Sequence, residues 1–196
     1  INNHENRNQL MIIRNMIVKG EKNVKEYIEN LLDVNIQDDE RLMYQTSKIP
    51  DGGLRGLIYS KVLYMQQNKI NYELNISPSL KAVELIELGE KNIIDMCKIV
   101  GVFLDNAIEE VSKLKNGKIS ISMYIVDDTL SIEISNNFEG NFDIERISDP
   151  GYTTKGKGHG YGLSLVRKII NENKYMTNLK RIDKDVFTQI LNIKIK

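Results

Sequence analysis

The chain has 196 residues, with 27 basic and 27 acidic side chains and no formal net charge. This length suggests one large domain or a smaller domain with an appendage, and the even charge argues against a nucleic-acid binder, which needs a clustered positive surface. A single cysteine, Cys97, excludes a disulfide framework or a thiolate metal cluster. No apolar run approaches the ~20 residues of a membrane helix. We expect a soluble, cytoplasmic protein as given; its start at Ile1, without methionine, suggests a fragment of a longer chain.

The first third of the chain is predicted to be helical, because apolar residues recur there at helical spacing. They form three groups: Leu10, Ile13 and Ile17; Val24, Ile28 and Leu31; and Leu54, Leu57, Ile58, Val62 and Met65. Gly20 separates the first two groups, and the stretch IPDGG at 49–53 supplies a turn and a helix start before the third. We therefore predict a helical module over residues 1–69.

After this module the pattern changes to strands mixed with helices. Apolar and β-branched residues at every second position predict strands at 71–77, 118–126, 129–135, 174–182 and 186–196. Asp127 and Asp128 are predicted to join two of these strands as a hairpin. The predicted fold class is α+β, with a helical N-terminal module followed by an α/β sandwich over residues 70–196.

A long helix is predicted from Ile93 to Leu114, where apolar residues alternate at spacings of four and three. The opposite face carries charged residues such as Asp105 and Glu109, as an ordinary solvated surface would. Asn106 is unusual there because asparagine is a poor residue in the middle of a helix. It also adjoins the apolar seam, where a half-buried amide oxygen can bind a hard cation such as Mg²⁺.

The segment GYTTKGKGHGYG at 151–162 has a glycine at every second position from residue 156 onward. It fails the Walker phosphate-loop pattern because Gly158 stands where a hydroxyl is required, and it lacks the strand that precedes a dinucleotide fingerprint. It leads directly into a helix whose first turn has no acidic residue. Free N–H groups there, with Lys155 and Lys157 nearby, favour an anion site. The alternative is a flexible surface loop that caps a helix.

These segments together resemble a known superfamily. LDNAIEE at 104–110, followed by the glycine-rich segment, resembles the ATP-binding fold shared by gyrase, Hsp90, MutL and histidine kinases, known as the GHKL or Bergerat-type fold. HENRNQL at 4–10 resembles the phosphoacceptor box of Agr-type peptide quorum-sensing histidine kinases. The matching residues of this box are His4, Glu5, Asn8 and Leu10. With GLIYSKVLYMQQNKI and VGVFLDNAIEE, which are similar to the same family, the resemblance covers nearly the whole chain.

The resemblance implies ATP and Mg²⁺ as cofactors and a role for individual residues. Asn106 would hold Mg²⁺ against the ATP phosphates, and Asn136 would read the adenine amino group, where most members of the superfamily use an aspartate. Val102 stands where the ATPases of the superfamily place a glutamate that activates water. His4 would accept the phosphoryl group with Glu5 as general base and Asn8 in the same box. The remaining nucleotide contacts would come from Thr153, Thr154, Lys155, Gly158, Gly160, Gly162 and Leu163.

The activity implied is a histidine autokinase that passes its phosphoryl group to an aspartate of a response regulator. The resemblance also implies a homodimer, expected here as a four-helix bundle built from the helix of His4 and the helix over 54–66. A membrane-embedded sensor would precede Ile1. The alternatives are an ATP-gated dimerisation module of the Hsp90/MutL type and a nucleotide-binding adaptor without catalysis.

Overall fold

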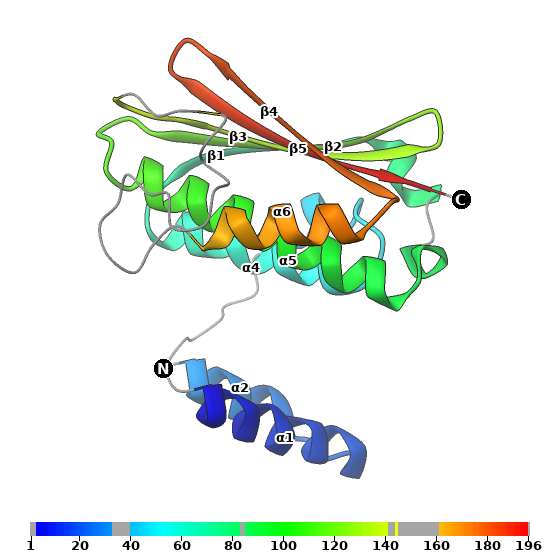
Figure 1. Cartoon of the computed structure of the whole chain (residues 1–196). Helices are drawn as coiled ribbons and strands as arrows, with labels where there is room; N and C mark the ends of the chain where they lie inside the picture. Colours follow the sequence, from blue (N-terminus) through cyan, green and yellow to red (C-terminus); the bar gives the residue numbers. More distant parts are fainter. Residues whose placement is uncertain (1–2, 33–39, 83–84, 141–143, 145–160, 196) are drawn as a thin grey trace. The chain divides into compact units, whose positions relative to one another are not determined.

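Figure 1 shows the computed structural model of the chain, which describes residues 3–32, 40–82, 85–140, 144 and 161–195. The chain separates into two compact units, Ile1–Asp39 and Glu40–Lys196. Among the described residues, no helix combines the length and the apolar character that a membrane span requires.

The first unit is a hairpin of two helices, α1 (Asn3–Lys19) and α2 (Val24–Leu32). Gly20 ends α1 with a positive φ of 67°, a conformation that suits glycine, and the N–H of Glu21 donates to the carbonyl of Met16 at 3.0 Å. Met16 is buried, and the Tyr27 hydroxyl donates to Oε1 of Gln9 at 2.7 Å. The structure thus confirms the first two predicted helices and the turn between them.

The same hairpin leaves much apolar surface uncovered. Leu10 and Ile17, which belong to the predicted apolar face of α1, are 66% and 62% exposed. Met11 and Val18 are exposed beside them. Each pair is spaced by seven residues, close to two turns, so the two pairs form neighbouring lines of one apolar stripe along α1. We call Leu10, Met11, Ile17 and Val18 the outer row. An apolar row of this kind marks a surface that another helix can cover.

The second unit is a two-layer sandwich in which α4, α5 and α6 lie against one face of a five-stranded sheet (Figure 1). The strand order is β1-β2-β3-β5-β4; β1 runs parallel to β2, and the other neighbours are antiparallel. Its elements are α3 (Glu40–Thr46), α4 (Gly53–Gln67), β1 (Asn71–Ile76), the 3₁₀ helices η1 (Pro78–Ala82) and η2 (Leu85–Leu88), α5 (Glu90–Val111), β2 (Lys118–Val126), β3 (Thr129–Asn137), α6 (Gly162–Glu172), β4 (Met176–Asp183) and β5 (Val186–Lys194).

The core lies between the helices and the sheet. Alternate residues of β2, β3 and β5 point into it, among them Ile121, Ile132 and Leu191, because successive side chains of a strand face opposite sides. The buried face of α5 is wider than predicted and includes Phe103, since α5 contacts α4 as well as the sheet. All five predicted strands are present, and Asp127, with a φ of 52°, lies in the turn of the predicted hairpin.

The position of α4 differs from the prediction that joined it to the helical module over residues 1–69. Leu54, Ile58, Val62 and Met65 are fully buried and belong to the core of the sandwich. The apolar face of this helix is therefore already covered by α5 and β1 and cannot also pair with a second copy in a four-helix bundle. The sequence pattern correctly indicated an amphipathic helix, but the surface that covers it belongs to the second unit.

Candidate functional site

Asn106 lies on α5 with its amide turned inward. Its Nδ2 atom is buried, and among the described residues it has no hydrogen-bond partner. An unpaired buried polar group costs about 1–3 kcal/mol, so its presence in a core helix calls for an explanation. With the nitrogen inside, the carbonyl oxygen is the atom of this amide that can face a cation. A single amide ligand suits Mg²⁺, which keeps most of its waters and binds substrate phosphates.

No group of three or more His, Cys, Asp or Glu side chains that could hold a metal ion by themselves occurs in the described part of the chain. Asp105, next to Asn106, forms an ion pair with Lys61 of α4 at 2.5 Å. An ion at Asn106 would therefore take most of its ligands from a bound substrate and from water. The donor set fits a metal that arrives with a phosphate-bearing molecule.

The start of α6 lies directly against α5. A Cβ atom at Gly162 would lie 3.0 Å from Cγ1 of Val102, so this glycine permits the close approach of the two helices. Val102 stands one helical turn before Asn106, on the same side of α5. The N-cap residue Tyr161 makes no side-chain cap bond, and the first turn of α6 is free of acidic residues. Its N–H groups can therefore bind an anion, while Leu163 packs on the core.

Asn136 lies near the end of β3 and is 6% exposed. Its Nδ2 atom donates to the carbonyl oxygen of Asn137 at 2.8 Å. This bond uses the nitrogen and leaves Oδ1 as the atom that can accept a hydrogen bond from a ligand. Because Asn136 alternates with Ile134 and Ile132, which are core residues, its side chain belongs to the helix-facing side of the sheet.

Gln189 of β5 is a polar residue of this face that the sequence analysis did not single out. It is 2% exposed, and its Oε1 atom is buried with no partner within the described ranges. In the sheet register it pairs with Ile134, while Asn136 pairs with Phe187. The sequence could have indicated this residue. Phe187, Leu191 and Ile193 alternate along a predicted strand, and this alternation places a glutamine on its apolar side.

Several predicted site residues are not described. Thr153, Thr154, Lys155, Gly158 and Gly160 lie outside the described residues. His4 and Glu5 lie within α1, but their side chains are also outside the description, and Asn8 is exposed on the same helix. Of the predicted nucleotide contacts, the structure brings Asn106 and Gly162 to adjacent helices and places Asn136 on the sheet face that those helices cover.

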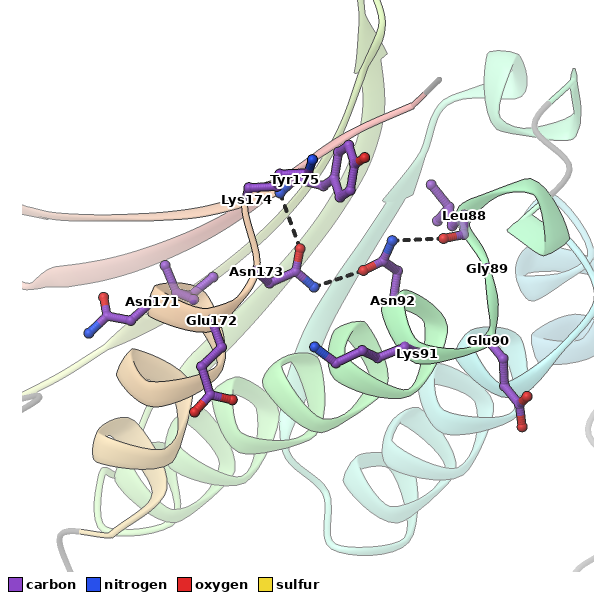
Figure 2. Close-up of a pocket in the computed structure, with 11 residues that line it drawn as sticks. Leu88, Gly89, Glu90, Lys91, Asn92, Asn171, Glu172, Asn173, Lys174 and Tyr175 are labelled. Atoms are coloured by element: carbon purple, nitrogen blue, oxygen red, sulfur yellow. Dashed lines mark hydrogen bonds between the residues drawn. The ribbon is translucent and has the colours of Figure 1, made fainter.

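A pocket of about 600 Å³ lies at the start of α5, away from Asn106 (Figure 2). Two of its polar residues, Asn92 and Asn173, bind one another. Asn173, after the end of α6, donates from Nδ2 to Oδ1 of Asn92 at 2.8 Å and to Oδ2 of Asp95 at 3.3 Å. Its Oδ1 accepts the N–H of Tyr175, and Nδ2 of Asn92 donates to the carbonyl of Leu88. This hydrogen-bond network joins α5 to α6, so its role is to stabilise the packing of the two helices.

The comparison with protein families identifies the class of protein. The model of the GHKL domain matches residues 91–196, more than half of the chain. The chain belongs to the GHKL family. The matched region begins in α5 and includes Asn106, Asn136, Gly162 and Gln189.

The relatives of this chain include sensor proteins and sensor histidine kinases. It is 27% identical to the sensor histidine kinase DcuS of Escherichia coli (strain K12) over 194 residues, which cover 95% of this chain and 33% of that protein. It is 24% identical to the sensor protein CitS of Halalkalibacterium halodurans over 174 residues, or 86% of this chain and 31% of that protein. The chain thus spans about a third of the length of these curated relatives.

The similar solved structures include histidine kinase catalytic domains. The catalytic domain of histidine kinase ThkA has a TM-score of 0.54 at 20% identity, over 73% of this chain and 93% of that one. Histidine kinase AdeS of Acinetobacter baumannii has a TM-score of 0.52 at 16% identity, over 98% of both chains. At these identities the likeness shows the fold. The Agr-type resemblance of residues 4–10 stays a prediction.

Proposed function

We propose that this chain is the kinase portion of a sensor histidine kinase, which uses ATP with Mg²⁺ to phosphorylate its own His4. The observation that carries the proposal is the adjacency of Asn106, Val102 and Gly162. Asn106 would be the cation ligand, and the free N–H groups at the start of α6 are suited to phosphates. Val102 is an apolar residue between them. Mg²⁺, when bound, would neutralise charge on the phosphates. Asn136 would accept a hydrogen bond from the adenine amino group.

Val102 favours phosphoryl transfer to histidine over hydrolysis. Its side chain cannot accept a proton, and it stands against Gly162, where the first turn of α6 would hold the phosphates. Val102 could not activate a water molecule beside it by accepting a proton. This argues against an ATPase of the Hsp90/MutL type, which needs such a base. The base would instead come with the acceptor: the Glu5 carboxylate takes the imidazole proton while Nε2 of His4 attacks the γ-phosphorus. The bond from phosphorus to ADP breaks in the same step.

The outer row of α1 suggests how two copies associate. Leu10, Met11, Ile17 and Val18 are all more than half exposed. A second hairpin of α1 and α2 could cover this row and complete a four-helix bundle, the usual way for helical hairpins to bury such a surface. We therefore propose a homodimer formed through the first unit. In this bundle α2 would be the second helix of each copy, instead of the helix over 54–66 that the sequence analysis expected.

The later steps of signalling are proposed from a similar solved structure and from the box at residues 4–10. We propose that His4 passes its phosphoryl group to an aspartate of a response regulator. A similar structure, histidine kinase ThkA, was solved in complex with the response regulator protein TrrA. It has a TM-score of 0.52 at 19% identity, over 98% of this chain and 59% of the ThkA chain. The Agr-like box at 4–10 supports a quorum-sensing role, with a membrane-embedded sensor elsewhere in the protein and this portion in the cytoplasm.

The test is incubation with ATP labelled at the γ-phosphate, followed by acid and base treatment of the labelled protein. Phosphohistidine is labile to acid and stable to base, so the label should be lost only in acid. His4→Gln should remove the label while the affinity for ATP stays the same, and Glu5→Gln should slow labelling by ~10²–10⁴, the range for a positioned general base. Label that persists in His4→Gln would contradict the proposal.

A further inference from the structure

Gln189 is out of keeping with its surroundings. It lies on the helix-facing side of β5 among Phe187, Leu191 and Ile193, all of which are buried. Its Oε1 atom is also buried, and no described residue donates a hydrogen bond to it. The free energy of a folded protein rises when such an acceptor leaves water without a new partner.

The cost points to a donor that is not part of the described chain. A methionine or leucine has a similar volume and would fill this place without any unpaired atom. Buried unsatisfied groups are few in folded proteins, and those that persist serve a purpose. In the described residues only two buried side-chain nitrogen or oxygen atoms lack a hydrogen-bond partner. One is Oε1 of Gln189, and the other is Nδ2 of Asn106 in the proposed nucleotide site.

The neighbour of Gln189 on β3 shows where that donor would lie. Asn136 pairs with Phe187 and Ile134 pairs with Gln189, so Asn136 and Gln189 are diagonal neighbours on the same face of adjacent strands. Diagonal neighbours are about 7–8 Å apart at the backbone, within reach of a long side chain. Asn136 presents Oδ1 because its Nδ2 is bound to Asn137. Two carbonyl oxygens are thus available to one donor group.

We propose that Gln189 is a second nucleobase-reading residue, which accepts one proton of the adenine 6-amino group while Asn136 accepts the other. This inference rests on the proposed binding of ATP. The 6-amino group carries two protons and can satisfy both carbonyls at once. Guanine presents an oxygen acceptor at the same position and would face two acceptors without a proton between them. The pair therefore selects adenine over guanine by unpaired acceptors, without a charged side chain.

The test is calorimetric binding of ATP, GTP and N6-methyl-ATP to the whole chain and to Gln189→Met. N6-methyl-ATP keeps one amino proton. In the parent, ATP should bind more tightly than GTP and N6-methyl-ATP. Gln189→Met should weaken ATP binding about three- to tenfold, the usual range for one neutral hydrogen bond, and should leave GTP binding unchanged. The difference between ATP and N6-methyl-ATP should shrink in the variant. Its melting temperature without nucleotide should be equal or higher.

Thr188→Val is the matched control. Thr188 is buried on the opposite face of the same strand and bonds to Ser135. This variant should keep the parent's ratio of ATP to GTP affinity. If the parent binds no ATP, the proposed function itself fails. If the parent binds ATP and Gln189→Met keeps the parent's ratio of ATP to GTP affinity, the inference about Gln189 is overturned while the proposed function stands. An equal loss for all three nucleotides would also overturn it, because Gln189 would then be structural.

Discussion

The two ends of α5 differ in the hydrogen bonding of their polar side chains. Near its start, Asn92 and Asp95 bind Asn173, and the amide of Asn173 is used at both its nitrogen and its oxygen. Figure 2 shows the bonds of Asn173 to Asn92 and to the N–H of Tyr175. Toward its other end, Asn106 has a buried nitrogen to which no described residue offers an acceptor. The first arrangement holds two helices together; the second has a cost that a ligand can repay. The helix has 22 residues, or about 33 Å, so changes at the two ends should be independent.

The largest expected effect is at the unpaired end. Asn106→Ala should weaken ATP binding by ~1.5–3 kcal/mol, about ten- to a hundredfold, when Mg²⁺ is present, because the proposed metal ligand is lost. Binding without Mg²⁺ should change little. The stability of the free protein should stay the same or rise, since an unpaired buried nitrogen is removed. Calorimetry with and without Mg²⁺ measures both affinities, and an equal loss in the two conditions would show that Asn106 is structural.

The paired end should show the reverse pattern. Asn173→Ala leaves Asn92 and Asp95 without a buried donor, which should cost about 1–3 kcal/mol in the free energy of unfolding. For a chain of this size that lowers the melting temperature by about 2–4 °C for each kcal/mol. The ATP affinity of the folded protein should not change. Asn171→Ala, an exposed position in the last turn of α6, is the control; if it destabilises the protein as much as Asn173→Ala does, the network contributes nothing specific.

A third variant tests the contact between α5 and α6. Gly162→Ala adds a methyl group 3.0 Å from Cγ1 of Val102, which should cost ~1 kcal/mol, the lower end for overpacking, and weaken ATP binding several-fold. Alanine is otherwise a better helix residue than glycine, so a loss of stability must come from the contact. The double variant Gly162→Ala/Val102→Ala should recover part of both losses. A Gly162→Ala protein with normal stability and affinity would refute the close approach.

The smallest effect concerns an ion pair at neither end. Nζ of Lys118 donates to Oε2 of Glu73 at 2.6 Å, and this hydrogen bond, followed by one to Asn75, lowers the pKa of Glu73 below its ordinary value of 4.5. A lowered pKa in the folded state stabilises the protein above pH 4.5, and this contribution is lost as the pH falls through the folded value. Glu73→Gln should therefore reduce the fall in melting temperature between about pH 5 and about pH 3. An unchanged fall would exclude the pair as a cause.

The sequence predicted best the features that local patterns determine. The strand predicted at 118–126 is present with the same bounds, because alternation of buried and exposed residues is a property of the strand itself. The helix α5 and the unusual place of Asn106 were predicted for the same reason. An amphipathic pattern does not say which surface covers it, so α4 was joined to the helices before it, whereas Leu54 and Ile58 pack in the sandwich.

Other features depend on contacts that no local pattern contains. Gln189 stands in a predicted strand, but its importance lies in an oxygen atom that lacks a partner, which only the packed structure reveals. The contact of Gly162 with Val102 joins residues that are far apart in the chain. The network of Asn173 is similar, because Asn92 and Asp95 are more than seventy residues away in the sequence.

The burial of α4 in the sandwich also determines where this chain can be divided and recombined. A compact unit can be moved as a separate module when the junction falls where few contacts cross. A junction at residue 70 would leave the helical residues Val62 and Met65 with the hairpin and strip an apolar cover from α5. A junction before Glu40 keeps that cover with the unit that requires it. The separable unit therefore starts at α3, and a chimera made there inherits a complete core.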